Sequence, residues 1–257
     1  MPRFADLKTE FPHVLYHGPK DPSEVVVKRY PPAGWVYLNQ ISKTARGAIL
    51  VSEDWAFYQH PGYDAKQIKE AITESVNSHK LKRGASTITQ QVVRNIYLSK
   101  EKTLTRKARE LWLSTKIEKV LSKNRILELY LNIAEFGDGI FGIGPAAHHY
   151  FNKNASELSA KEGAFLAMLL PSPKRYAVSF QKHELTLYAR KTIHSILNKM
   201  VQANYLSPEE KTTEWLKPLS FESKFDATIP VADDDDSIDL DEEVTIPDDQ
   251  ELHSNRN

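Results

Sequence analysis

Apolar residues recur every three to four positions along most of the chain between Asp64 and Tyr205, which is the period of amphipathic helices. Several of these segments begin with a polar residue followed three positions later by Glu or Gln, the pattern that caps the start of a helix. The pairs are Asp64 with Gln67, Ser159 with Glu162, and Ser207 with Glu210. The pattern predicts helices over residues 64–79, 86–98, 105–121, 123–136, 159–170 and 184–205, and a short one after Ser207.

Extended structure is expected in only two short stretches, Val25–Val27 and Trp35–Leu38. The residues from Leu7 to Tyr30 have no clear period, and Pro31–Gly34 interrupts the chain. The expected fold class is therefore mostly α. We divide the chain into an N-terminal extension (1–34), one globular domain (35–225) and a C-terminal tail (226–257).

The chain of 257 residues has a formal net charge of zero, but its charges are unevenly distributed. Of the 34 acidic and 34 basic residues, 12 acidic ones and a single basic one, Arg256, lie from Asp226 onward. The body before the tail keeps 22 acidic and 33 basic residues, a net charge of +11, which suits an anionic membrane surface or a pyrophosphate ligand. Nucleic acid is disfavoured, because the basic residues stand beside amides and carboxylates rather than among aromatic residues. The tail has too few apolar residues to order itself.

Composition excludes several kinds of site and segment. The chain has no cysteine, so it forms no disulfide framework and no zinc–thiolate site. No apolar run reaches the roughly 18–20 residues that cross a membrane, and no secretory signal pattern opens the sequence. No spacing of His with carboxylates predicts a tight metal site.

The segment Arg83–Asn95 joins a basic, glycine-containing loop to the start of a predicted helix. Five of its polar residues fall on two adjoining stripes of that helix: Ser86, Gln90 and Arg94 on one, Gln91 and Asn95 on the other. Hydroxyls, amides, a guanidinium and free backbone N–H groups at a helix start suit an anion such as phosphate or pyrophosphate. The plainer alternative is a capped amphipathic helix with a solvated polar face.

A second candidate site follows the apolar run Ala48–Val51. Two carboxylates come first there and aromatic residues and a histidine come after them: Glu53, Asp54, Trp55, Phe57, Tyr58 and His60. Burial against rings raises a carboxyl pKa toward the range in which it can act as a general base near neutral pH. The alternative for a lone Glu-Asp pair is an acidic cap on a helix or turn.

Together the two segments resemble the peptidoglycan glycosyltransferases. Glu53–Gly62 is similar to that family's Glu-Asp-x-x-Phe-x-x-His-x-Gly motif, and Gly84–Asn95 to its Gly-x-Ser-Thr-Ile-Thr-Gln-Gln-x-x-Lys-Asn motif. Arg106–Glu110 and Lys123–Asn132 follow in the expected order and resemble Arg-Lys-x-x-Glu and Lys-x-x-Ile-Leu-Glu-x-Tyr-Leu-Asn. The resemblance covers about Trp35–Tyr205 and is closest to the monofunctional members, which lack a penicillin-binding domain.

One residue departs from these motifs. The family has Lys where this chain has Arg94. The positive charge is kept, but a guanidinium stays protonated at any working pH and cannot transfer a proton.

The resemblance implies a lysozyme-like helical domain with a cleft between two helical lobes, and an inverting glycosyltransferase activity. It implies that Glu53 is the base acting on the acceptor hydroxyl and that Glu110 lies beside the donor pyrophosphate. The substrate-binding residues that it implies are Ser86, Gln90, Gln91, Arg94, Asn95, Lys102, Arg106 and Lys107. It implies no tightly bound cofactor, although Mg²⁺ or Mn²⁺ could bridge pyrophosphate and carboxylate. Without the resemblance, Arg106, Lys107 and Glu110 would be interpreted as a surface ion-pair ladder.

The resemblance further implies where the protein acts and on what. It implies polymerisation of lipid II into cell-wall glycan strands, with release of undecaprenyl pyrophosphate, at the periplasmic face of the inner membrane. The expected partners are lipid II, the growing lipid-linked strand, the membrane surface, and proteins of cell-wall synthesis or division, and not nucleic acid. Met1–Lys28 lacks the N-terminal membrane anchor that monofunctional members usually carry. The basic amphipathic segment Ile68–Leu81 could contact the membrane or cover the donor site as a lid.

Two alternatives from other functional classes stay open at this point. A lysozyme-like muramidase that cuts glycan strands would also use two carboxylates on a helical scaffold. The phosphate-adapted stripe of Ser86–Asn95 argues against it, because hydrolysis leaves no pyrophosphate to stabilise. A non-catalytic module that binds cell wall or membrane is the other alternative, if Arg94 has cost the chain its activity.

Overall fold

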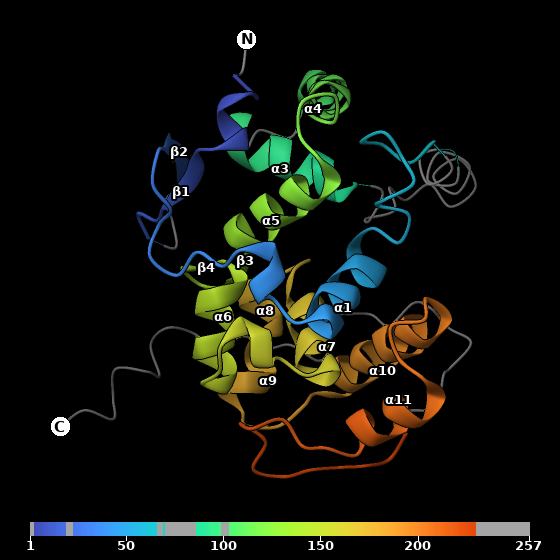
Figure 1. Cartoon of the computed structure of the whole chain (residues 1–257). Coiled ribbons are helices and arrows are strands. Elements are labelled where there is room, and N and C mark those ends of the chain that lie inside the picture. Colours follow the sequence, from blue (N-terminus) through green and yellow to red (C-terminus); the bar gives the residue numbers. More distant parts are fainter. Residues whose placement is uncertain (1–2, 19–22, 66–68, 70–85, 99–102, 230–257) are drawn as a thin grey trace, which may run out of the picture.

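The computed structural model describes residues 3–18, 23–65, 69, 86–98 and 103–229. These residues are mostly helical, which confirms the expected fold class (Figure 1). The longer helices are α1 (Lys43–Glu53), α3 (Ile88–Tyr97), α4 (Leu104–Ile117), α5 (Lys123–Ile133), α6 (Ile143–Phe151), α7 (Ala160–Leu169), α10 (Leu187–Gln202) and α11 (Pro208–Trp215). The shorter ones are α8 (Pro173–Tyr176), α9 (Val178–Gln181) and the 3-10 turns η1 (Asp6–Lys8), η2 (Leu38–Gln40) and η3 (Ala155–Glu157). Most of the predicted helix over 64–79, most of the acidic tail and Lys102 lie outside the described residues.

Hydroxyl side chains set where most of the helices begin. In each case the hydroxyl accepts a hydrogen bond from a backbone N–H that the first helical turn leaves without a partner. The caps are Ser42, Thr87, Thr103, Ser122, Ser159, Thr186 and Ser207. The predicted capping boxes of Ser159 with Glu162 and Ser207 with Glu210 are confirmed, and Thr87 with Gln90 forms another.

Helix α1 is the largest difference from the sequence-based expectation. Its continuous apolar run Ala48–Val51 shows no helical face, because α7 and α10 both pack against it and bury nearly all of its circumference. The period of the run therefore carried no helical signal.

The stretch expected to be extended, Trp35–Leu38, is not a strand in a sheet; it runs into η2. The Asn132 side chain replaces a neighbouring strand, since its Oδ1 accepts from Val36 N–H and its Nδ2 donates to Val36 O, both at 2.8 Å. The predicted helix over 123–136 ends at Ile133, and a short hairpin of β3 (Glu135–Gly137) and β4 (Ile140–Phe141) follows.

Two strands lie within the region that the sequence pattern left without a period. β1 (Phe11–Leu15) pairs antiparallel with β2 (Glu24–Lys28), which includes the predicted extended stretch Val25–Val27. Arg125 of α5 fixes this region to the helices by donating from Nε to Leu7 O and from Nη2 to Glu10 O, each at 2.8 Å. Its guanidinium also lies over the ring of Phe11.

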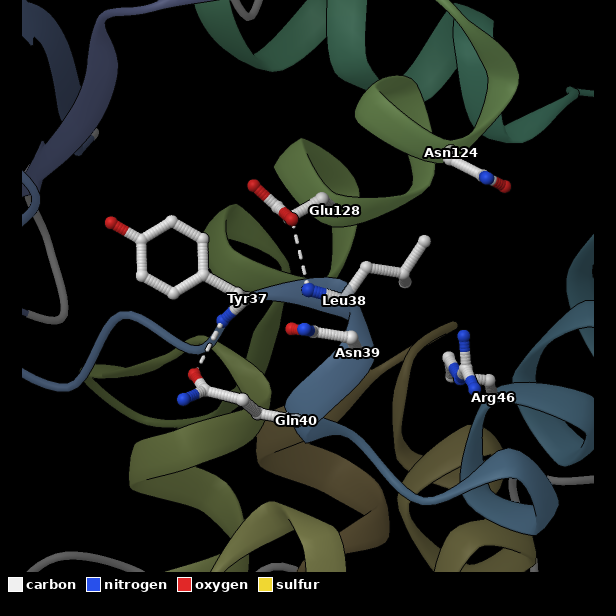
Figure 2. Close-up of a pocket in the computed structure, with 7 residues that line it drawn as sticks. All are labelled: Tyr37, Leu38, Asn39, Gln40, Arg46, Asn124 and Glu128. Atoms are coloured by element: carbon white, nitrogen blue, oxygen red, sulfur yellow. Dashed lines mark hydrogen bonds between the residues drawn. The ribbon is translucent and has the colours of Figure 1, made fainter.

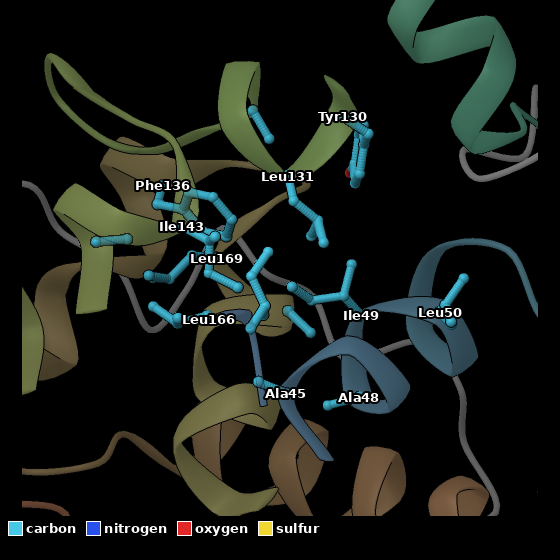
Figure 3. Close-up of a cluster of buried hydrophobic side chains, with 14 of the residues drawn as sticks. Ala45, Ala48, Ile49, Leu50, Tyr130, Leu131, Phe136, Ile143, Leu166 and Leu169 are labelled. Carbon is cyan, nitrogen blue, oxygen red and sulfur yellow. The ribbon is translucent and has the colours of Figure 1, made fainter. Parts of the chain in front are cut away.

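Helices α1 and α7 form the centre of the hydrophobic core, and Figure 3 shows Ala45, Ala48 and Ile49 of α1 facing Leu166 and Leu169. All ten residues of α7 are buried. The two backbones come close at Gly163, where an added Cβ would lie 2.5 Å from the Cα of Ala45. This contact sets the distance between α7 and the helix that ends in Glu53.

We expect Gly163→Ala to lower the free energy of unfolding by about 1–3 kcal/mol, the usual cost of overpacking a core. A helical Gly→Ala change normally stabilises by roughly 1 kcal/mol, so a net loss would report the steric contact. Gly47→Ala is the comparison within α1, because its new Cβ would lie 2.6 Å from the ring of Tyr205, a side chain that is 37% exposed, rather than against backbone. Urea unfolding of both variants tests this, and a Gly163→Ala protein as stable as the Gly47→Ala protein would contradict it.

Candidate active site

The last residue of α1, Glu53, lies against helices α3 and α5. Gln91 of α3 donates from Nε2 to Glu53 Oε2 at 2.8 Å, and the Tyr130 hydroxyl of α5 lies 3.4 Å from the same oxygen. Burial raises the pKa of Glu53, while the hydrogen bonds from Gln91 and Tyr130 and the charge of Arg94 partly oppose the rise. A carboxyl group in this setting can accept a proton nearer neutral pH than an exposed glutamate can.

Tyr130 is not among the site residues expected from the sequence, and the structure places its hydroxyl beside Glu53. Burial and the Glu53 carboxyl together raise the pKa of Tyr130 well above its ordinary value. The hydroxyl therefore stays protonated and acts as a donor. No local signal could have found this contact, because the two residues are 77 positions apart in the chain.

Asp54, the neighbour of Glu53, is fully buried and links two segments. Its Oδ1 lies 2.8 Å from His60 Nε2, and its Oδ2 accepts from the backbone N–H of Ile88 at 2.9 Å. Because His60 Nδ1 accepts from the N–H of Gly62, the His60 hydrogen is on Nε2 and is donated to Asp54. The two adjacent carboxyl groups thus have different roles: that of Glu53 can act as a base, and that of Asp54 holds the start of α3.

A second cluster is centred on Glu110 of α4. Its side chain is fully buried, with Arg106 Nη1 at 2.7 Å from Oε2 and Lys107 Nζ at 2.6 Å from Oε1. Lys107 also donates to Ser86 Oγ at 2.9 Å and to Gln90 Oε1 at 3.3 Å. These five side chains, predicted together from the motifs, lie together, and a surface ion-pair ladder does not describe them.

The two clusters meet on α3. Gln91 contacts Glu53, and the preceding residue, Gln90, contacts the Lys107 that pairs with Glu110. Arg94 lies one turn further along α3, and its charge acts on Glu53. Asn95 is exposed on the same helix.

Other predicted features have the following positions. Glu128, within the fourth motif, lies in a polar network: it accepts from the backbone N–H of Leu38 at 2.8 Å and pairs with Arg125. Among the described residues, no group of three or more His, Cys, Asp or Glu side chains could hold a metal ion. No helix in this described part of the chain is long and apolar enough to cross a membrane.

Comparison with known proteins agrees with this geometry. The model of the transglycosylase family matches residues 23–201. The biosynthetic peptidoglycan transglycosylase of Cronobacter sakazakii is 47% identical over 145 residues, which are 56% of this chain and 60% of that protein. The protein of the same name from Nitrosomonas eutropha is 43% identical over 156 residues, 61% of this chain and 64% of that protein.

A similar relative is the biosynthetic peptidoglycan transglycosylase of Yersinia pestis, 45% identical over 145 residues, which are 56% of this chain and 60% of that protein. The chain thus spans less than two thirds of the length of these relatives. The family match includes both clusters and all four motifs. The chain has a mostly helical, lysozyme-like domain, and its two carboxyl clusters meet on α3. It belongs to the transglycosylase family.

Proposed function

We propose that this chain polymerises lipid II into peptidoglycan glycan strands, with inversion at the anomeric carbon and release of undecaprenyl pyrophosphate. The observation that carries the proposal is the pairing, across α3, of a partly buried carboxyl of raised pKa with a cluster of cations and hydrogen-bond donors. Formation of a glycosidic bond from a sugar pyrophosphate needs a base on one side and charge stabilisation on the other.

In the proposed reaction the acceptor hydroxyl gives its proton to Glu53. Its oxygen forms the new bond to the donor's anomeric carbon from the face opposite the leaving group, and the bond from that carbon to the pyrophosphate oxygen breaks. Gln91 and Tyr130 hold the Glu53 carboxyl in one orientation. The distance between Glu53 and Glu110 should exceed the roughly 5 Å of a retaining glycosidase, because a sugar must fit between them.

The departing pyrophosphate would bind at the Glu110 cluster. Arg106 and Lys107 supply positive charge, Ser86 and the start of α3 supply donors, and Glu110 orients the two cations. Both carboxyl oxygens of Glu110 already accept from these cations, so this carboxyl does not suit a tightly held Mg²⁺ or Mn²⁺. The proposed reaction uses Arg106, Lys107 and Arg94 instead.

We further propose that the reaction takes place at the periplasmic face of the inner membrane, where lipid II, the growing strand and other proteins of cell-wall synthesis or division meet. The net charge of +11 on residues before Asp226 supports contact with an anionic membrane surface. Incubation with labelled lipid II in detergent or vesicles tests the function directly. Polymer supports it, cleavage of added glycan strands without polymer indicates a muramidase, and binding without reaction indicates a non-catalytic module.

Glu53→Gln should keep the fold and lower the turnover of lipid II at least ~10²-fold, the usual share of a general base. The amide has nearly the same shape as the carboxyl but cannot accept the proton. Glu24→Gln, an exposed change on β2, is the control for the loss of one negative charge. Polymerisation by the Glu53→Gln protein at the wild-type rate would remove Glu53 from the mechanism.

The pH dependence of kcat/KM should have an acid limb set by Glu53. Only the ionised carboxyl can act as a base, so the rate should fall as pH drops through its pKa, which burial places above the ordinary 4.5. The Arg94 charge lowers that pKa, so Arg94→Ala should move the limb to higher pH and Arg94→Lys should leave it in place. A limb at the same pH in all three proteins would contradict this assignment.

Arg94 has a second expected role, which is to stabilise negative charge on the donor phosphate. The size of the rate loss in Arg94 variants measures this role. Arg94→Lys should retain most of the activity, whereas Arg94→Ala should lower it about 10²–10³-fold, as for a lost oxyanion donor. The measurement is the initial rate with lipid II at a pH above the acid limb of both variants. An Arg94→Ala protein as active as wild type there would mean that this stripe of α3 does not bind the donor.

A further inference from the structure

Away from Glu53 and Glu110, an open pocket of about 490 Å³ lies beside η2. Its lining comes from η2, α1 and α5, and Figure 2 shows the residues: Tyr37, Leu38, Asn39, Gln40, Arg46, Asn124 and Glu128. A second pocket of about 600 Å³ is lined by Trp35, Val36, Pro145, Asn154 and their neighbours. Gln40 lines both, and Trp35 and Val36 of the second pocket continue directly into Tyr37 and Leu38 of the first, so the two pockets adjoin; together they are called here the η2 groove.

The η2 groove is separate from the candidate active site. Among the described residues, none of the side chains that contact Glu53 or Glu110 lines either pocket. The Glu53 cluster uses the end of α1, α3 and α5, and the Glu110 cluster uses α3 and α4. The groove shares α1 and α5 with the first cluster but uses other residues of them, together with η2, α6 and η3.

Two partly exposed tyrosine rings lie at the first pocket: Tyr37 lines it on the side opposite Arg46 (Figure 2), and Tyr58 contacts Asn124, which also lines it. Tyr37 is 45% exposed and Tyr58 is 52% exposed, and the Tyr58 hydroxyl donates to Asn124 Oδ1 at 3.2 Å. Burial raises the pKa of Tyr58, with a smaller contribution from Tyr205, and the charge of Arg46 partly opposes the rise. Sugars bind to partly exposed aromatic rings, which pack against the C–H faces of the sugar. They also bind to amide side chains that have free donors or acceptors, which form hydrogen bonds with the sugar hydroxyls.

Arg46 gives the groove one uncompensated positive charge. Within the described part of the chain, its side chain has no ion pair or hydrogen bond, and its Nε is buried without a partner. Glu128, the acidic residue of the same pocket, is already neutralised by Arg125 and by the N–H of Leu38. Lys153 in the adjoining pocket pairs with Glu162 at 2.7 Å. A single free guanidinium suits one carboxylate and not a polyanion such as nucleic acid.

We propose that the η2 groove binds a peptidoglycan strand outside the catalytic site, with sugar rings on Tyr37 and the amides and a stem-peptide carboxylate on Arg46. The inference rests on the proposed function, which supplies the polymer. Peptidoglycan combines neutral sugars with carboxylate-bearing peptides at regular intervals, and both features have a counterpart in the groove. Two adjoining pockets also suit an extended chain better than a single small ligand.

The test is a binding titration of the full chain with two soluble strands: uncrosslinked glycan that keeps its stem peptides, and a chito-oligosaccharide of similar length, which has neither lactyl nor peptide carboxylates. Arg46→Ala should weaken binding of the peptide-bearing strand about tenfold, as for a lost charge-assisted hydrogen bond, and change binding of the neutral strand less than twofold. Tyr37→Ala should weaken binding of both strands.

The matched controls are Arg29→Ala, since the Arg29 side chain is 93% exposed, and Tyr30→Ala, since Tyr30 is 59% exposed. Both should bind as wild type does, and thermal unfolding of each variant checks that it is folded. Equal affinity of Arg46→Ala and Arg29→Ala for the peptide-bearing strand would overturn the proposal. So would wild-type protein that binds both strands equally well.

Polymerisation of lipid II, measured in parallel, separates this inference from the function on which it rests. A wild-type protein that makes no polymer, yet loses strand binding on Arg46→Ala, would support the groove and contradict the proposed enzyme. A wild-type protein that makes polymer, with strand binding unchanged by Arg46→Ala and Tyr37→Ala, would contradict the groove alone.

Discussion

Asp54 is buried between the end of α1 and the start of α3, where its two oxygens accept hydrogen bonds from His60 and from the backbone N–H of Ile88. This buried carboxylate is costly to disrupt, because loss of either donor leaves a buried oxygen without a partner, and loss of the carboxylate leaves both donors without one. The link fixes the first turn of α3 relative to α1. Gln91 can reach Glu53 only because of that fixed placement.

The same turn of α3 also orders the second cluster. Thr87 caps this turn, and its hydroxyl donates to Gly62 O. The side-chain oxygen of Gln90 accepts from the backbone N–H of Thr87. Gln90 in turn faces Lys107, which reaches Ser86. One short helix start therefore fixes a carboxyl on one side and a set of cations on the other.

The two glutamates differ through their surroundings and not through their chemistry. Glu53 has neutral donors close by, with the Arg94 charge a smaller influence, and burial dominates its pKa. Glu110 lies between two cations that bond to both of its oxygens. A carboxyl of the first kind can take up a proton, and one of the second kind positions its neighbours.

Local sequence pattern was sufficient for the parts of this protein that local forces control. Hydroxyl caps and helical periodicity located α3, α4, α5, α7, α10 and α11 to within a few residues, because a cap and an amphipathic face lie within one segment. The grouping of Ser86, Gln90, Arg106, Lys107 and Glu110 could also be expected, from spacing together with the family motifs.

Tertiary structure decided the features that depend on distant partners. α1 is a helix whose apolar run hides its period, because helices far along the chain bury it on several sides. Trp35–Leu38 is held by a side-chain amide 96 positions away, and the Tyr130 hydroxyl reaches Glu53 across 77. The division of labour between Glu53 and Asp54 likewise follows from which donors surround each. Adjacent residues of similar chemistry have nearly the same local signal, and only the packed neighbours distinguish them.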